Sequence, residues 1–192
     1  RWDMIARGGD YCVLQLRRQH ACGFDYLAQI RYQLLRNQLI ASLTLTHCGS
    51  TPIPYGCGFH PFFSFDKRST VQFTAGGYWP EGEQHLPLDW QSHLPGYADF
   101  SHPQYGEDRW LNVGYSGWSG RARIVSDVMT ITILSQTSWL MLFRMQGEPF
   151  LCLEPQTHPV NAHNMDGQPG LRVLGAGDTL NFSLKIDVQG RE

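Results

Sequence analysis

Residues 38–46 read Gln-Leu-Ile-Ala-Ser-Leu-Thr-Leu-Thr, a stretch in which apolar and polar side chains alternate along nearly the whole length. Alternation with a period of two is typical of a strand that buries one face. Residues 25–36 fit either a strand or a helix, but as a strand they can pair with 38–46 through a tight hairpin at Asn37-Gln38. With a further strand at 11–17, the front of the chain is predicted to form an antiparallel meander.

Strand patterns recur through the rest of the sequence. They cover residues 69–75, 121–125, 128–134, 139–145, 150–153 and 180–188. Twenty glycines and 11 prolines supply turns between them, and no segment has a convincing helical pattern. We therefore predict an all-β fold, an antiparallel β-sandwich formed by a single domain over residues 1–192.

The segment 53–63, Ile-Pro-Tyr-Gly-Cys-Gly-Phe-His-Pro-Phe-Phe, contains a histidine with unusual surroundings, His60. Gly56 and Gly58 allow close approaches of the backbone that a side chain would block. Pro61 favours an extended conformation at the histidine before it. An imidazole held in this way can donate or accept a proton near neutral pH. The alternative is a structural histidine that hydrogen-bonds to the backbone.

A second segment ends an apolar run in a carboxylate. Residues 150–154 read Phe-Leu-Cys-Leu-Glu, and Pro155 is expected to stop the strand directly after Glu154. Partial burial at such a position would raise the pKa of the glutamate towards the range of a useful base. The alternative is an ordinary glutamate at a strand end.

Four segments together resemble the galactose mutarotase, or aldose 1-epimerase, family. They are Gly58-Phe59-His60-Pro61-Phe62-Phe63, Leu153-Glu154-Pro155-Gln156-Thr157, residues 109–124 with a Gly-Trp step, and residues 170–177. They occur in the family's order from about residue 53 onwards, although Phe62 stands where the family usually has tyrosine. The resemblance implies the family's fold, a large twisted sandwich of two antiparallel sheets, which agrees with the strand pattern.

The resemblance also implies an activity. An aldose 1-epimerase interconverts the α and β anomers of a free hexose, such as galactose or glucose, and it needs no cofactor. By carry-over from the family, Glu154 is the base that takes the proton from the C1 hydroxyl, and His60 is the acid that protonates the ring oxygen. The ring then opens, the C1–C2 bond rotates, and the ring closes on either face. The expected partner is therefore a monosaccharide substrate.

Four further residues are expected to bind the sugar. Asn112 lies five residues before the glycine of the Gly-Trp step, where many family members carry aspartate. Its amide can bond to a hydroxyl but supplies no charge, and it could also be a simple turn former. Trp118 is either a stacking ring or a core residue. Gln156 and His158 lie just past the glutamate and are expected to line the same pocket.

A long section from residue 76 to residue 109 is rich in aromatic, glycine and proline residues. Its aromatic side chains include Trp79, Trp90, Tyr97, Phe100 and Tyr105. Long loops in compact domains are usually functional or disordered, and this aromatic density argues against disorder. The rings are expected either to stack on the apolar face of a pyranose or to pack the loop onto the sheet.

The front of the chain departs from the family. The family usually has an upstream arginine and a His-Gly segment, and nothing before His60 matches either of them. We therefore predict that the chain is the C-terminal two-thirds of a longer protein, with an N-terminal part missing. Two alternatives to a free-hexose mutarotase stay open: a non-catalytic carbohydrate-binding or sensing protein, and a hexose-6-phosphate mutarotase that would use arginines among Arg109, Arg121 and Arg123.

Composition excludes several classes of partner. The net charge of −2 and the lack of a basic run argue against binding to nucleic acid or to an anionic membrane, and no apolar stretch is long enough to cross a membrane. The five cysteines include no C-x-x-C pair, which favours reduced thiols in the cytoplasm, with Cys12, Cys57 and Cys152 as small core residues.

A metal site is not expected. Glu154, His158 and His163 are close in sequence, but their spacing matches no zinc motif. We predict no metal ion or cofactor, and a monomer or homodimer as the assembled state.

Overall fold

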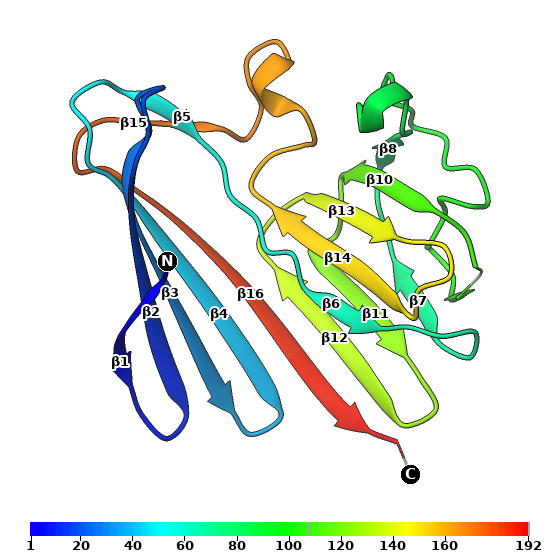
Figure 1. Ribbon diagram of the computed structural model, residues 1–192. Coiled ribbons are helices and arrows are strands. Elements are labelled where there is room, and N and C mark those ends of the chain that lie inside the picture. Colours follow the sequence, from blue (N-terminus) through cyan, green and yellow to red (C-terminus); the bar gives the residue numbers. More distant parts are fainter. Residues whose placement is uncertain (107, 192) are drawn as a thin grey trace.

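The computed structural model describes residues 1–106 and 108–191, and it is built almost wholly of β-strands (Figure 1). The larger sheet contains β1 (Asp3–Arg7), β2 (Tyr11–Gln19), β3 (Asp25–Leu35), β4 (Gln38–His47), β7 (Thr70–Phe73), β9 (Gln104–Tyr105), β11 (Arg121–Val125), β12 (Met129–Ser135) and β16 (Thr179–Gly190). The smaller sheet contains β6 (Phe62–Ser64), β8 (Gly77–Trp79), β10 (Leu111–Ser116), β13 (Trp139–Arg144) and β14 (Phe150–Gln156). A two-stranded ribbon pairs β5 (Ile53–Tyr55) with β15 (Arg172–Leu174).

The strand orders are β1-β2-β3-β4-β16-β12-β11-β7-β9 in the nine-stranded sheet and β6-β14-β13-β10-β8 in the five-stranded sheet. The strand pairs within both sheets are antiparallel, so the predicted all-β antiparallel sandwich is confirmed. Two short 3-10 turns interrupt the β structure, at Glu83–His85 and Ala162–Asn164. In the described part of the chain, no helix is long and apolar enough to cross a membrane.

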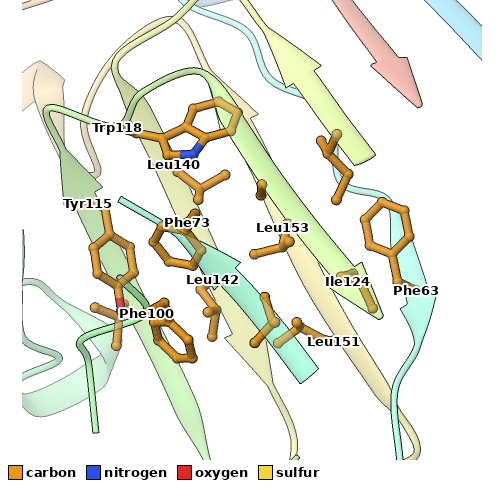
Figure 2. Close-up of a cluster of buried hydrophobic side chains, with 14 of the residues drawn as sticks. Phe63, Phe73, Phe100, Tyr115, Trp118, Ile124, Leu140, Leu142, Leu151 and Leu153 are labelled. Atoms are coloured by element: carbon orange, nitrogen blue, oxygen red, sulfur yellow. The ribbon is translucent and has the colours of Figure 1, made fainter. Parts of the chain in front are cut away.

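The main core lies between the two sheets (Figure 2). The larger sheet supplies Val71 and Phe73 from β7 and Ile124 from β11, and the smaller sheet supplies Leu142 from β13 and Leu153 from β14. The meander strands β1–β3 extend beyond this core on one side (Figure 1). The smaller sheet therefore has one face that packs on the core and one face turned away from it.

The alternation along β14 decides which side chains face away from the core. Leu151 and Leu153 belong to the core, whereas Cys152 and Glu154 project from the opposite face. This outer face of the smaller sheet carries the candidate site.

The hairpin between β3 and β4 is shifted by one residue from its predicted position. Leu35 pairs with Gln38, so the two-residue turn is Arg36-Asn37 and not Asn37-Gln38. Gln38 belongs to the sheet because it also pairs with Asp187 of β16, and its side chain donates a hydrogen bond of 2.8 Å to that carboxylate. Arg36 takes the left-handed conformation of the turn, with φ of 56°.

The prediction that Pro155 stops the strand at Glu154 is wrong, because β14 continues to Gln156. In an antiparallel strand the N–H and C=O of one residue point towards the same neighbour. The carbonyl of Pro155 accepts a hydrogen bond from Phe59, away from β13, so its nitrogen also faces that side. The missing N–H therefore costs no hydrogen bond with β13, and the proline is tolerated.

Several strands were not predicted. The clearest is β10, in which Leu111, Val113 and Tyr115 alternate with Asn112 and other small or polar residues. Gly114 and Ser116 weaken the apolar pattern of β10, which explains why the sequence does not predict this strand. The others are β1, β5, β6, β8, β9 and β15, which are at most five residues long. Residues 107 and 192 lie outside the described residues. The first falls in the predicted aromatic section, and the second is the end of the predicted domain.

Candidate active site

Two segments that are far apart in the sequence run side by side and bring His60 to Glu154. The Thr157 N–H donates to the Cys57 carbonyl at 2.8 Å, and the Phe59 N–H donates to the Pro155 carbonyl at 3.0 Å. These contacts extend the register of β6 and β14 back along the chain, so that His60 stands opposite Glu154. The two motifs of the sequence are therefore joined by their own backbone hydrogen bonds.

The side chains of this pair touch. The Nε2 atom of His60 lies 3.2 Å from Oε1 of Glu154. The histidine side chain is 53% exposed, whereas the glutamate side chain is 11% exposed. The imidazole stacks on Phe62, with ring centroids 4.9 Å apart, and Phe62 in turn packs on Phe150. The aromatic neighbours fix the ring plane, so the nitrogen points at the carboxylate.

Burial sets the electrostatics of the glutamate. Removal from water raises the pKa of Glu154 from 4.5 to about 7. The thiol of Cys152 lies next to it on the same face of β14, and burial, followed by the negative charge of Glu154, raises the pKa of this thiol to about 12. The carboxyl group can therefore gain or lose a proton near neutral pH, while the thiol below it stays protonated.

His60, Cys152 and Glu154 also offer three possible metal ligands, whose ligand atoms lie within 4.8 Å of one another. A metal ion would bind the thiolate form of the cysteine. Because burial disfavours that form so strongly, the arrangement is better suited to proton transfer between the histidine and the glutamate. The cluster differs from the set considered in the sequence, because it joins His60 and Cys152, and not His158 and His163, to Glu154.

Gln156 ends β14 two residues after the glutamate, and His158 lies in the loop that follows. Gln156 projects from the same face of β14 as Glu154, and its Cγ lies over Gly58. The ring of His158 lies against Gly56, where a Cβ atom would come within 1.9 Å of the imidazole. Its Nδ1 atom is 2.9 Å from the carbonyl of Pro159. The glycine at 56 is required for this packing, and the histidine is held beside the site by local contacts.

Asn112 projects from the same sheet face as Glu154. Asn112 pairs with Phe143 of β13. Two residues further along β10, Gly114 pairs with Met141, and Met141 pairs in turn with Glu154 of β14. Asn112 is thus two strands away from Glu154, displaced by two residues along the sheet. Its amide donates a hydrogen bond of 2.8 Å to Glu81, so Asn112 is part of a side-chain cluster and not merely a turn former.

The structure does not place Trp118 in the site, which corrects its assignment as a substrate-binding residue. Trp118 is 3% exposed and lies in the main core (Figure 2). Its indole N–H donates to the carbonyl of Arg121 at 3.0 Å. The alternative interpretation, core packing, is the one observed. The preceding Gly117 has φ of 63°, and the sharp turn that this allows directs the indole inward.

Sequence reasoning missed Glu81, Trp110 and His85. Trp110 is 40% exposed and its indole N–H donates to Glu81 at 2.6 Å, while His85 contacts the same carboxylate at 2.5 Å. Trp110 directly precedes β10, and the alternation of that strand, extended by one residue, was a usable signal because it puts Trp110 on the same face as Asn112. For Glu81 there was no local signal, since its partner Asn112 is 31 residues further along the chain.

The aromatic section contains both buried and exposed rings, and those in the main core pack the loop onto the sheet as one of the two expectations had it. Phe100 and Tyr78 are buried in the main core, whereas Trp90 and Tyr105 are exposed. Trp90 donates a hydrogen bond of 2.7 Å to Ser116, which ties this loop to the end of β10. Of the predicted core cysteines, Cys152 is fully buried, and Cys12 and Cys57 are partly buried.

The sequence model of the aldose 1-epimerase family matches residues 2–187. Among curated proteins, the chain is 28% identical over 200 residues to the uncharacterized protein YphB of Escherichia coli K12, with 98% of this chain and 68% of that protein covered.

Solved structures with a similar fold include proteins with aldose 1-epimerase or galactose 1-epimerase names. A crystal structure from Escherichia coli K12 that carries a provisional aldose 1-epimerase name has a TM-score of 0.94 and 26% identity, and the match covers 99% of this chain and 69% of that one. Galactose 1-epimerase from Lactobacillus acidophilus NCFM has a TM-score of 0.79 at 15% identity, with coverage of 100% and 67%. At that identity the second likeness concerns the fold alone.

Proposed function

This chain belongs to the aldose 1-epimerase family, and on that premise we propose that it interconverts the α and β anomers of a free hexose such as galactose or glucose. The observation that carries the proposal is the contact between His60 and Glu154, 3.2 Å apart and set in unlike environments. Mutarotation requires one acid and one base at the same sugar, and this pair offers both.

In the proposed mechanism, the carboxylate of Glu154 removes the proton from the C1 hydroxyl while His60 donates a proton to the ring oxygen. The C1–O5 bond breaks and the open-chain aldehyde forms. Rotation about C1–C2 presents the other face of the carbonyl, and the two groups return their protons in the reverse step. The enzyme ends each cycle in its starting protonation state.

The different exposure of the two groups supports this division of roles. A base works best when its pKa is near the working pH, and burial brings the pKa of Glu154 to about 7. The half-exposed His60 can exchange protons with water. A sugar that enters would separate the two groups and replace their mutual contact by contacts to C1–OH and O5.

The outer face of the smaller sheet carries polar groups for the rest of the sugar. Gln156 and Asn112 lie on this face at different distances from Glu154, and both can bond to hydroxyls. The exposed indole of Trp110 offers an apolar surface next to Asn112. We propose Gln156, His158 and Asn112 as substrate-binding residues, with Glu154 and His60 as the catalytic pair.

A hexose-6-phosphate substrate is less well supported. Arg121 and Arg123 are exposed on β11, where Ala122 and Ile124 face the core. They therefore lie on the outer face of the larger sheet, on the far side of the sandwich from Glu154. A phosphate held by these arginines would be out of reach of the catalytic pair.

We further propose that residues 1–192 are a single β-sandwich domain of a longer protein, in line with the 68% coverage of YphB. The five cysteines are all free, which fits a reducing compartment such as the cytoplasm. A monomer or a homodimer is the proposed assembled state.

The test is the anomeric exchange rate of galactose and of glucose, measured by magnetisation-transfer NMR with the full-length protein. We expect clear acceleration that falls by at least about 10²-fold in Glu154→Gln. Glu148→Gln, at an exposed turn between β13 and β14, is the matched control and should keep full activity. Binding without acceleration on either sugar would favour a carbohydrate-binding or sensing protein. Acceleration that survives in Glu154→Gln would show that the base is elsewhere.

A further inference from the structure

A second polar cluster lies on the same sheet face as the catalytic pair, centred on Glu81. The carboxylate accepts hydrogen bonds from Asn112 at 2.8 Å and from Trp110 at 2.6 Å, and His85 contacts it at 2.5 Å. The Glu81 side chain is 19% exposed. A carboxylate held from three sides near the surface has a fixed orientation, which a binding group needs.

These bonds leave specific atoms available to a ligand. Asn112 and His85 both contact Oε1 of Glu81, whereas Trp110 is the residue seen to contact Oε2 within residues 1–106 and 108–191. A carboxylate oxygen can accept about two hydrogen bonds, so Oε2 retains one position. The Asn112 amide uses its NH₂ group on Glu81, and its carbonyl oxygen can serve a ligand as a second acceptor.

A small hollow adjoins this cluster. It is lined by Glu81, Asn112 and Gly114 together with Met141, Val160 and the neighbouring Trp79-Pro80 segment, and its volume is about 10 Å³. That is about the room needed for one water molecule or one hydroxyl group. Val160 packs onto Gly114 at the floor of the hollow. A Cβ atom at residue 114 would come within 2.8 Å of the Val160 side chain, so this packing needs glycine.

The position relative to the catalytic pair suits a single sugar. Met141 lines the hollow and also pairs directly with Glu154. The strands that carry Asn112 and Glu154 are two apart in the sheet, about 10 Å, and the two residues are offset by two positions along the strands, about 7 Å, so their backbones are about 12 Å apart. A pyranose with its hydroxyls can bridge that span, with the anomeric carbon at Glu154 and another hydroxyl at the hollow.

We propose that Glu81 is a sugar-binding residue that acts as a unit with Asn112, and that the pair receives one hydroxyl of the hexose away from the anomeric carbon. The inference rests on the proposed function. Glu81 supplies the negative charge that Asn112 lacks, and a hydroxyl that donates to a carboxylate forms a charge-assisted bond. The negative charge is then provided by Glu81, at the end of the neighbouring strand, and not by residue 112.

The ionised state of Glu81 fits this role. Burial alone would raise the pKa of Glu81, but the hydrogen bonds from Asn112, His85 and Trp110 outweigh it and hold the pKa below its usual value. The carboxylate is therefore charged at neutral pH, and it acts as an acceptor only.

A charge-swap series tests the proposal, with sugar affinity measured by NMR titration and KM and kcat by anomeric exchange. Glu81→Gln should weaken binding of galactose or glucose about 10-fold and raise KM, with kcat largely kept. Asn112→Asp should also weaken it, because two carboxylates would then face each other at hydrogen-bond distance. The double variant, Glu81→Gln with Asn112→Asp, restores one charge and one amide and should recover affinity to within about 3-fold of the original protein.

Controls separate this inference from the proposed function. Glu83→Gln, two residues away and exposed, should bind sugar normally, and melting curves show whether each variant is folded. Monodeoxy sugars give a second readout: the original protein should discriminate against one of them, and Glu81→Gln should lose that discrimination. Glu81→Gln with unchanged affinity, or a double variant no better than Glu81→Gln, would overturn the inference alone. Sugar binding that depends on Glu81 without any anomeric exchange would overturn the proposed function alone, and no sugar binding at all would overturn both.

Discussion

His60 stands directly opposite Glu154 in a register that starts as the pairing of β6 with β14 and continues beyond β6. The geometry of the pair is therefore set by backbone hydrogen bonds, and the side chains meet because two antiparallel segments align them. Residues that fix this alignment should affect catalysis without touching the sugar.

Thr157 is the clearest positioning residue of this kind. Its Oγ1 accepts a hydrogen bond of 2.9 Å from the Cys57 N–H, next to the backbone bond between the same two residues. Thr157→Val removes the acceptor and leaves a partly buried N–H unpaired, at a cost of about 1–2 kcal/mol. We expect kcat to fall several-fold as His60 loses its alignment, with little change in KM, both measured by anomeric exchange.

Thr157→Ser is the matched control, because it keeps the hydroxyl and should retain both stability and kcat. If Thr157→Val lost only stability, with kcat intact in the folded fraction, the residue would have a purely structural role.

The pH dependence of activity should report on Glu154. Because burial raises its pKa to about 7, the fraction of ionised base grows as pH rises through this value. We expect kcat/KM to fall about tenfold for each pH unit below about 7, and this acid limb to be absent from any residual activity of Glu154→Gln. Measurements of kcat/KM from pH 5 to pH 8 show whether this acid limb is present. An acid limb that persists in Glu154→Gln would mean that Glu154 is not the base.

The same carboxyl group should lower stability at higher pH. Between pH 4.5 and about 7 the folded chain retains a proton that the unfolded chain has already released, so stability decreases as pH rises through this window. The loss should be about 2 kcal/mol, allowing for solvent screening at the exposed edge of the group.

Glu154→Gln removes this penalty. Its melting temperature should match that of the original protein near pH 4.5 and exceed it by roughly 4–8 °C at pH 8, as measured by calorimetry at both values. An equal difference at the two pH values would assign the effect to packing and not to ionisation.

The sequence was sufficient to predict the parts of the fold that depend on local alternation. The strands β2, β3, β4 and β16 follow from a period of two, and the segment with His60 and the segment with Glu154 were identified from glycine, proline and carboxylate positions. The turn at Arg36-Asn37 was misplaced by one residue because its register depends on β16, which pairs with β4 from the far end of the chain.

The rest of the site depends on contacts that no local pattern encodes. Pro155 is compatible with a strand only because its nitrogen faces the edge, and that is known once Phe59 is seen to bond to its carbonyl. The sequence leaves open whether Trp118 is a stacking ring or a core residue, and only its place between the two sheets shows that it is buried, whereas Trp110, which the sequence did not single out, is exposed. Glu81 acquires its partners through the pairing of β8 with β10.

The buried position of Trp118 gives a last prediction. Trp118→Phe removes the hydrogen bond to the Arg121 carbonyl and leaves a small cavity in the main core, so the free energy of unfolding should fall by about 2 kcal/mol. Urea unfolding measures this loss, and KM for galactose should be unchanged, because the indole does not reach the outer face of the smaller sheet. The comparison is Trp110→Phe, at an exposed position beside Glu81, where we expect the reverse: little loss of stability and a higher KM. A higher KM in Trp118→Phe with normal stability would return that indole to the binding site.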